Sequence, residues 1–286
     1  MNKSDIFDKN SVISNLKRAS KQFNNYDYLF QEVAERTSER LLDVNKKFNV
    51  AAEIGSRGNI LSNIFLKKKI IEKFEIYSLH KFHKFGQSGD AVFDNELLPL
   101  RKNSLNLIVS NLNLHTVNDL PGVLLQINNA LEPDGLFIGS IFGGLTLFEL
   151  RKTFHEADVL TSGEPFPRVL PFLDIKDAGN LLQRAGFSLI VADVDKIEVQ
   201  FSSLKKLFYD LRYMGEANSM TKRKKNFSTK SFFKRTNQLY KEYFTNKNGK
   251  LTATFEVIYF SGWAPDKSQQ KPLKPGSAIK SLSEVL

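Results

Sequence analysis

The feature that most constrains the fold of this chain is an alternation of short apolar runs with helical stretches, which begins at residue 48. The runs are short enough for strands, and the segments between them carry apolar residues at helical spacing. The alternation occupies residues 48–54, 60–71, 74–79, 105–110, 120–131 and 135–141. Strands that alternate with helices build a parallel sheet that helices cover on both faces. The sequence therefore predicts an α/β protein.

Two longer β patterns follow, at residues 187–201 and 251–263. Their length and the lack of a short helix between them favour an antiparallel pair at one edge of the sheet. A helix is predicted from Asp174 to Ala185, with Asp174 as its N-cap and Gly186 as its C-terminal stop. The chain is thus expected to form a mostly parallel sheet of seven strands that ends in an antiparallel strand pair.

The 286 residues are sufficient for one domain with an elaborated insertion. Residues 1–45 carry apolar positions at helical spacing among many charges, which predicts an N-terminal helical extension. Residues 46–265 are predicted to form the α/β domain, with a helical and basic cap insertion at about 202–248. Residues 266–286 are predicted to form a C-terminal tail.

Composition excludes several kinds of site. The chain has no cysteine, which rules out disulfides, thiolate metal ligands and cysteine nucleophiles and is consistent with a reducing compartment. No run approaches the roughly 18 to 20 apolar residues of a membrane-spanning helix. The start of the chain lacks the apolar stretch of a secretory signal. We therefore expect a soluble, cytoplasmic protein without a transmembrane segment.

The formal net charge of +10 favours an anionic partner such as RNA, an acidic protein or a lipid surface. Much of the excess is local, because cations crowd one short segment. A solvated basic loop is the simpler interpretation and the one we favour. The cations of this segment are Lys222, Arg223, Lys224, Lys225, Lys230, Lys234 and Arg235.

Residues 50–59 form an apolar strand that ends in an acidic residue and a glycine-containing turn, before a predicted helix. Glycine lets the backbone approach a ligand closely, because it has no Cβ and tolerates positive φ. Such a turn suits the cofactor S-adenosylmethionine (SAM), and a tight turn without a ligand is an equally weighted alternative. The candidate cofactor-binding residues here are Glu53, Gly55, Ser56 and Gly58.

Three further candidate cofactor-binding residues lie along the predicted sheet. Asp94 and Asn95 have the form of a third-strand loop, in which an acidic side chain binds the adenine amino group. Ser110 follows the fourth strand, at the edge where ligands of open α/β sheets bind. The second strand, by contrast, ends without the acidic side chain that would accept both ribose hydroxyls. Losing such bonds, worth about 1.5–3 kcal/mol, is expected to weaken SAM affinity roughly ten-fold to a hundred-fold or more.

Several stretches of the chain resemble one protein family. They are LHTVNDLP at 114–121, PDGLF at 133–137, GGLTLFELR at 143–151, DLRYMGEAN at 210–218, and GWAP, SQQKP and GSA between 262 and 278. This set resembles alphaproteobacterial relatives of a methyltransferase-like assembly factor of mitochondrial respiratory complex I. Those relatives are themselves similar to the malonyl-carrier-protein methyltransferases of biotin synthesis. The stretches after Gly143 lie outside the shared cofactor core, so the resemblance goes beyond the general fold.

The resemblance implies a class I, Rossmann-like methyltransferase fold, SAM as the cofactor, and a protein client such as a respiratory complex I subunit. In the mitochondrial branch it implies a role in complex I assembly, in which an arginine of a client subunit is hydroxylated rather than methylated. The sequence departs from the family pattern at Arg57 and Asn59 in the glycine turn, at Asn106 where Asp is usual, and at Thr116 where Trp is usual.

Methyl transfer from SAM requires mainly proximity and alignment, with a single base to remove a proton. His115 and Asn111 follow the fourth strand and are the candidate catalytic residues: His115 as a base or client-orienting group, and Asn111 as a contact to cofactor or substrate. An equally weighted alternative is a structural His115, hydrogen-bonded within its loop. His80 and His83 have a two-histidine spacing, but no nearby carboxylate completes a facial triad, so no metal site is predicted.

The leading hypothesis is a SAM-dependent, methyltransferase-like enzyme that acts on a protein client in respiratory complex I assembly. A non-catalytic pseudo-methyltransferase, retained as an assembly chaperone, is the first alternative, and SAM binding separates the two. RNA binding or RNA modification through residues 222–235 is the second alternative. Phe227, Phe232 and Phe233 would then be available to stack on bases.

Overall fold

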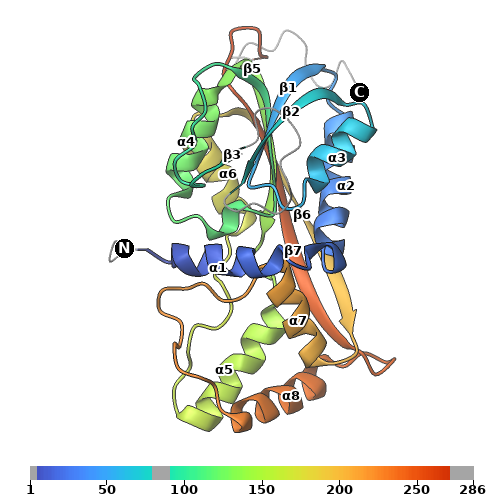
Figure 1. The fold of residues 1–286 in the computed structure, drawn as a ribbon, viewed down its shortest axis with the longest axis vertical. Coiled ribbons are helices and arrows are strands. Elements are labelled where there is room, and N and C mark those ends of the chain that lie inside the picture. The colour runs from blue at the N-terminus through green and yellow to red at the C-terminus, as the bar shows by residue number, and fades with distance from the viewer. Residues whose placement is uncertain (1–4, 79–90, 271–286) are drawn as a thin grey trace, which may run out of the picture.

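A seven-stranded sheet forms the centre of the protein in the computed structural model, which describes residues 5–78 and 91–270 (Figure 1). The strand order is β3-β2-β1-β4-β5-β7-β6. Neighbours from β3 to β5 run parallel, whereas β7 runs antiparallel to both β5 and β6. The predicted α/β class, parallel sheet and antiparallel C-terminal pair are confirmed. The strands are β1 (Phe48–Ile54), β2 (Ile71–Ser78), β3 (Ala91–Val92), β4 (Leu105–Asn111), β5 (Leu131–Phe142), β6 (Ser188–Phe201) and β7 (Leu251–Trp263).

Successive residues of the central strands pack on opposite faces of the sheet, because the side-chain period of a strand is two. In β4, Leu107 and Val109 belong to one hydrophobic core and Ile108 to the other. Helices α2 and α3 contribute to the first core, and α4 and α6 to the second. The sheet is therefore the middle of three layers (Figure 1). These helices are α2 (Tyr28–Leu42), α3 (Ile60–Lys67), α4 (Leu120–Ala130) and α6 (Ile175–Arg184).

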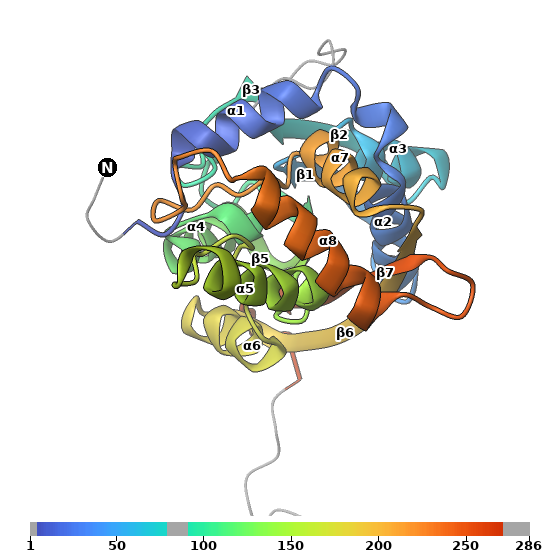
Figure 2. The ribbon, with the colours of Figure 1, turned by 90° about the horizontal axis from the view of Figure 1, so that it is seen from below.

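Three more helices, which we call the cap, extend the protein at the lower end in Figure 1. They are α5 (Phe148–Ser162), α7 (Leu204–Met214) and α8 (Lys230–Phe244), and Figure 2 shows them from below. The ring of Phe154 on α5 stacks on Phe208 of α7 and on Phe232 of α8. Helices α7 and α8 come from the segment predicted as a helical cap insertion. Across the residues that the structure describes, we find no helix with the length and apolar character needed to cross a membrane.

Helix α1 (Lys9–Ala19) crosses the molecule between the sheet and the cap (Figure 1). The side-chain amide of Asn15 donates a hydrogen bond to the carbonyl of Ala217, which follows α7 (2.8 Å). The N–H of Phe7 donates to Oδ1 of Asn118, in the segment that follows β4 (2.8 Å). Helix α1 therefore connects the carboxyl edge of the sheet with the cap.

Two strands begin more than one residue away from the predicted start. Strand β5 begins at Leu131 rather than at Gly135, because Leu131 already pairs with Leu105 across a register shift. Strand β2 begins at Ile71 rather than at Phe74, because Lys69 has a φ of 56° and turns the chain soon after α3 ends. Both corrections lengthen strands at their amino ends and leave the carboxyl edge of the sheet where the sequence predicts it.

Asp174 caps helix α6, as the sequence predicts, by accepting a hydrogen bond from the N–H of Asp177 (2.8 Å). We expect Asp174→Ala to lower the free energy of unfolding by about 1 kcal/mol, because a helix N–H loses its acceptor. Urea unfolding followed by circular dichroism measures the change. Lys176→Ala, at an exposed position of the same turn, is the control and should stay within about 0.5 kcal/mol of the parent. Equal losses in the two variants would contradict a specific cap.

Candidate functional site

The loops that follow β1 and β4 meet at the carboxyl edge of the sheet. Gly55 has a φ of 74°, in the left-handed region, and the side chain of Asn113 packs directly against it. A Cβ at position 55 would lie 1.9 Å from Cγ of Asn113, so only glycine fits this arrangement. The N–H groups of Gly55 and Ser56 donate to the carbonyl of Tyr77 at 2.7 and 3.1 Å. These bonds fix the turn to the end of β2.

Polar atoms near this turn are buried without a hydrogen-bond partner. Asn95 Nδ2 donates to Asn113 Oδ1 at 3.2 Å, but Asn95 Oδ1 and Asn113 Nδ2 have no partner among the described residues. The same holds for His115 Nδ1 and Arg57 Nε. An unpaired buried polar group costs about 1–3 kcal/mol, so several of them together indicate a ligand site. The turn and its donors and acceptors fit a polar cofactor such as SAM.

A buried ion cluster lies next to the turn. Glu216 follows α7, and its carboxylate pairs with the Arg57 guanidinium through Oε1 and with His115 Nε2 through Oε2, the latter at 2.9 Å. Each of the three side chains is exposed by 5% or less. We call these three residues the ion cluster.

The ion cluster sets the charge of Glu216. Burial alone would raise the pKa of Glu216, but the charges of Arg57 and His115 and the hydrogen bonds from both lower it to about 2. Glu216 is therefore a carboxylate, which can only accept the hydrogen bond that it shares with Nε2 of His115. Nδ1 of His115 is left without a hydrogen-bond partner among the described residues.

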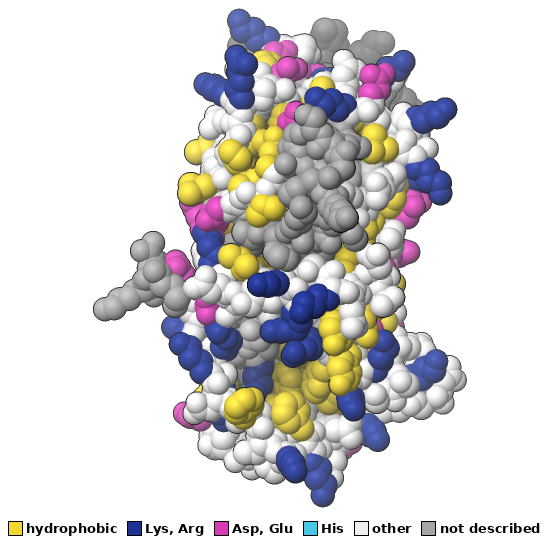
Figure 3. Space-filling view, in the orientation of Figure 1, with side chains coloured by type: hydrophobic (Ala, Val, Ile, Leu, Met, Phe, Trp, Pro, Cys, Tyr) yellow, Lys and Arg dark blue, Asp and Glu magenta, His cyan; other side chains and the backbone are white. Residues whose placement is uncertain are grey.

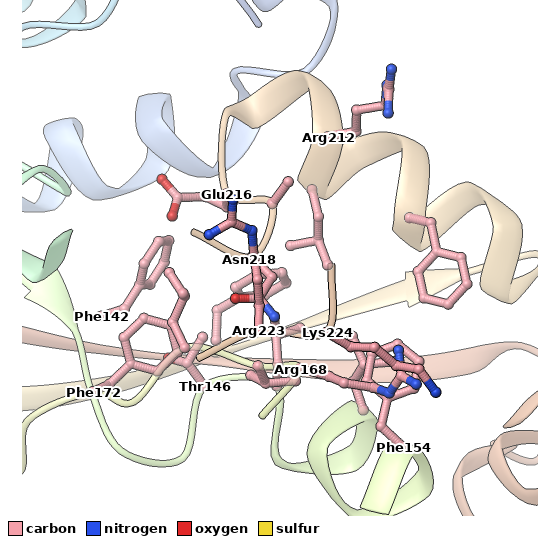
Figure 4. Close-up of a pocket in the computed structure, with 18 of the residues that line it drawn as sticks. Phe142, Thr146, Phe154, Arg168, Phe172, Arg212, Glu216, Asn218, Arg223 and Lys224 are labelled. Carbon is pink, nitrogen blue, oxygen red and sulfur yellow. The ribbon is translucent and has the colours of Figure 1, made fainter. Parts of the chain in front are cut away.

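A cavity of about 460 Å³ opens under the cap, next to Glu216 (Figure 4). The rings of Phe142 and Phe172, in its wall, lie 4.8 and 5.9 Å from the ring of His115. The cavity therefore adjoins the ion cluster and, through it, the glycine turn. The rest of its lining is Thr146, Leu147, Leu150, Phe154, Arg168, Val169, Leu170, Phe208, Leu211, Arg212, Ala217, Asn218, Arg223, Lys224, Phe232, Phe233 and Phe255.

Three of the candidate residues bond to other parts of the fold. Glu53 Oε2 accepts a hydrogen bond from the N–H of Ser62 at 3.1 Å, which ties β1 to α3, and burial raises the pKa of Glu53. The Ser110 hydroxyl donates to a carbonyl of β1 at 3.0 Å. Asn111 Nδ2 donates to the carbonyl of Phe30 in α2 at 3.1 Å. All three side chains are buried and hold the strands and helices that form the site.

Asp94 lies at the same edge of the sheet and faces α1. Lys9 Nζ pairs with Asp94 Oδ2 at 2.7 Å and with Glu96 Oε2 at 3.2 Å. Burial alone would raise the pKa of Asp94, but the bonds from Lys9 and from the Glu96 N–H lower it below its usual value. A ligand that uses Asp94 must therefore share it with Lys9.

The two glycines of the turn face different surroundings. Gly55 lies with Asn95 against Asn113, two residues before His115. Gly58, with a φ of 75°, lines a separate hollow between α2 and α3. Ser56 stays within the turn, where its hydroxyl donates to Oδ1 of Asn59 at 3.3 Å. The structure thus brings Gly55 and Asn95 together on Asn113, joins His115 to Arg57 of the same turn through Glu216, and leaves Gly58 in a separate hollow.

Sequence reasoning missed the contributions of Asn113, Arg57 and Glu216. Two signals were available: Arg57 stands at a glycine position of the usual turn pattern, and Glu216 lies in the stretch 210–218 that carries the family resemblance. Neither signal says that the two side chains meet, because they are 159 positions apart.

The predicted two-histidine spacing, His80 and His83, lies outside the described residues. Among the residues that the structure does describe, no group of His, Asp and Glu is arranged to hold a metal ion. Strand β2 ends at Ser78, and the chain beyond it enters the same undescribed segment. The lack of an acidic partner for the ribose therefore stays a prediction from sequence.

Comparison with known proteins adds to this geometry. Residues 25–192 match a family model described as a methyltransferase domain. The arginine-hydroxylase NDUFAF5, mitochondrial, of Danio rerio is 35% identical over 267 residues, which cover 91% of this chain and 82% of that protein. The malonyl-[acyl-carrier protein] O-methyltransferase of Xylella fastidiosa (strain M23) is 29% identical over 272 residues, which cover 91% and 89% of the two chains.

A solved structure shares the fold. It is the phosphoethanolamine N-methyltransferase 2 of Haemonchus contortus in complex with phosphomonomethylethanolamine and S-adenosylhomocysteine. The TM-score is 0.55 at 12% identity, and the match covers 89% of this chain and 60% of that one. At this identity the likeness concerns the fold alone.

Proposed function

Because the chain belongs to the methyltransferase-domain family and, within it, to the group of the NDUFAF5 arginine-hydroxylases, we propose that it binds SAM and acts as a methyltransferase-like enzyme on a protein client. The proposed target is an arginine side chain, after the name of these relatives. The proposed client is a subunit of respiratory complex I, and the proposed place of action is the cytoplasm.

The observation that carries the proposal is the set of unpaired buried polar atoms beside Gly55. Asn95 and Asn113 would bind the polar groups of SAM, Gly55 would let the backbone approach it, and Asp94 would accept a hydrogen bond from the adenine amino group. Entry of SAM requires the side chain of Asn113 to leave its position against Gly55. When bound, SAM supplies an activated methyl group.

The cavity under the cap is the proposed site of the client side chain. It reaches Glu216, whose partner His115 has an unpaired Nδ1. Glu216 already holds one guanidinium, that of Arg57, which also lies 5.1 Å from the ring centroid of Phe30. A carboxylate beside aromatic rings suits a guanidinium. His115 would hold or accept a proton at Nδ1 while Glu216 fixes the ring.

We expect the protein to bind SAM in isothermal titration calorimetry and Asp94→Asn to weaken that binding about tenfold, because a charge-assisted bond to the adenine is lost. Asp94→Asn also removes the ion pair with Lys9. Lys9→Gln is therefore the matched control, since it breaks the same ion pair and leaves the carboxylate to the cofactor. We expect Lys9→Gln to bind SAM at least as tightly as the parent.

Equal weakening of SAM binding in Asp94→Asn and Lys9→Gln would contradict an adenine contact. It would indicate that the loss comes from a change in how α1 packs on the sheet. Absence of any heat with the parent protein, at two temperatures, would exclude the SAM-dependent function. The fold would then serve to bind a client without modifying it.

A further inference from the structure

The cavity under the cap has two chemically different ends. Figure 4 shows Phe142 and Phe172 at one end, on the side of Glu216, and Phe154 at the other. The Arg168 guanidinium carbon lies 5.7 Å from the ring centroid of Phe154, at that second end. A single occupant of this cavity therefore meets a carboxylate at the end near the ion cluster and cations at the end near the cap.

Two of the lining cations are already neutralised within the protein. Arg168 binds both carboxylate oxygens of Asp158, at 2.6 and 2.7 Å. Arg223 pairs with Asp8 at 3.0 Å. Because each is paired with a carboxylate, these two arginines add little free positive charge. They shape the cavity wall and hold the loop 215–229 to α1 and α5.

Lys224 and Arg212 are different, because neither forms an ion pair with a carboxylate in the described part of the chain. Lys224 Nζ lies 4.3 Å from the ring centroid of Phe166. Arg212 is exposed on α7 and points outward at the rim of the cavity (Figure 4). These two cations are available to a negatively charged group that enters from solvent.

The cavity interior between the two ends is aromatic and aliphatic. Phe142, Phe232 and Phe255 line it and are buried, whereas Phe233, also in the lining, is 45% exposed. Figure 3 shows Lys and Arg side chains beside an exposed hydrophobic patch on the lower half of the molecule, where the cap lies. An apolar side chain of a bound molecule would therefore enter the cavity, while charged groups next to it in that molecule would stay at the cavity rim.

We propose that the cavity docks an acidic segment of the client, with the target arginine at the Glu216 end, a large apolar side chain in the aromatic interior between the two ends, and Asp or Glu residues on Lys224 and Arg212. The inference rests on the proposed function and specifies how its client is recognised. Charge complementarity argues for an acidic segment, because unpaired cations steer and hold carboxylates. The aromatic interior argues for a polypeptide rather than for a polyanion that carries phosphates alone.

The test uses three rhodamine-labelled peptides and fluorescence anisotropy. The first peptide is Glu-Asp-Phe-Ser-Gly-amide with the rhodamine on its N-terminal amine. The second replaces the acidic pair by two lysines, and the third replaces the phenylalanine by serine. We expect the parent protein to bind the first peptide about tenfold or more tightly than either of the others, since each change removes one of the two recognised groups. Equal binding of the acidic and the lysine peptide would overturn the inference.

Two double variants locate the binding on the protein. Lys224→Glu with Arg212→Glu reverses the two free cations of the cavity rim. Lys222→Glu with Lys225→Glu makes the same change in net charge at exposed positions that do not line the cavity. We expect the first pair to weaken binding of the acidic peptide about tenfold and the second pair less than about twofold. Equal losses would overturn the inference and indicate a diffuse basic surface for lipid or RNA.

Calorimetry with SAM on the same samples separates this inference from the proposed function. Retained SAM binding in the Lys224→Glu, Arg212→Glu variant shows that the variant is folded. A loss of peptide binding then reports the removal of the two cations and not unfolding. A parent protein that binds the acidic peptide but not SAM would overturn the proposed function and leave the docking site. A parent that binds SAM but none of the peptides would overturn the docking site alone.

Discussion

Replacing Glu216 by alanine is expected to lower the free energy of unfolding by about 3–5 kcal/mol, because the Arg57 guanidinium stays buried without its carboxylate. The side chains of Arg57 and Glu216 are 3% and 5% exposed, so solvent does little to replace the lost partner. Urea unfolding at neutral pH measures the effect. Glu32→Ala, which breaks the exposed pair of Glu32 with Arg36, is the control and should cost less than about 1 kcal/mol.

The stability contribution of Glu216 is expected to depend on pH, and the direction of the change follows from its pKa. The pKa of Glu216 is about 2 in the folded protein, against an ordinary value of 4.5 for a free carboxyl. A lowered folded-state pKa means that the contribution of Glu216 is complete above pH 4.5 and is lost as the pH falls towards 2. The stability difference between the parent and Glu216→Ala should therefore shrink across that window. A difference that stays constant from about pH 5 down to about 2.5, checked by repeating the urea series, would contradict the ionised state of Glu216.

Most of the fold was predictable because it follows from local periodicity. The apolar run of β4 and the two long β patterns near the C-terminus lie where the sequence predicts them, since a strand buried on both faces is a short continuous apolar run and a half-buried strand alternates. Asp174 and Gly186 mark the ends of α6 for reasons that are equally local. The two misplaced strand starts depend on a register shift and on the positive φ of Lys69, which leave no periodic signal.

The candidate site was predictable only where one loop supplies it. Gly55 and His115 stand out because each follows a strand at the carboxyl edge. The residues that decide the chemistry around them come from distant positions: Glu216 is 101 residues from His115, and Lys9 is 85 residues from Asp94. A carboxylate in the sequence does not reveal which cation will pair with it in the folded protein. That choice is made by the packing of the cap and α1 on the sheet.

Replacing Gly55 by alanine is expected to weaken SAM binding by about a hundredfold or more, which corresponds to about 2.7 kcal/mol or more. Two physical effects contribute. The φ of 74° is unfavourable for any residue with a Cβ, and that Cβ would lie 1.9 Å from Cγ of Asn113. The clash displaces Asn113 and puts a methyl group where the backbone would approach the cofactor. Calorimetry with SAM measures the loss.

Two further variants separate these effects. Gly249 has a φ of 73°, and no atom of the described residues lies within 4 Å of the position that a Cβ would take there, so Gly249→Ala carries the same backbone strain without the clash. We expect it to cost about 1 kcal/mol of stability and to leave SAM affinity unchanged. Adding Asn113→Ala to Gly55→Ala removes the group that the new Cβ strikes but also removes a proposed SAM contact, so it should recover stability lost to the clash without restoring SAM affinity. If Gly55→Ala alone binds SAM as the parent does, the turn after β1 is a structural turn and the cofactor, where it binds, lies elsewhere.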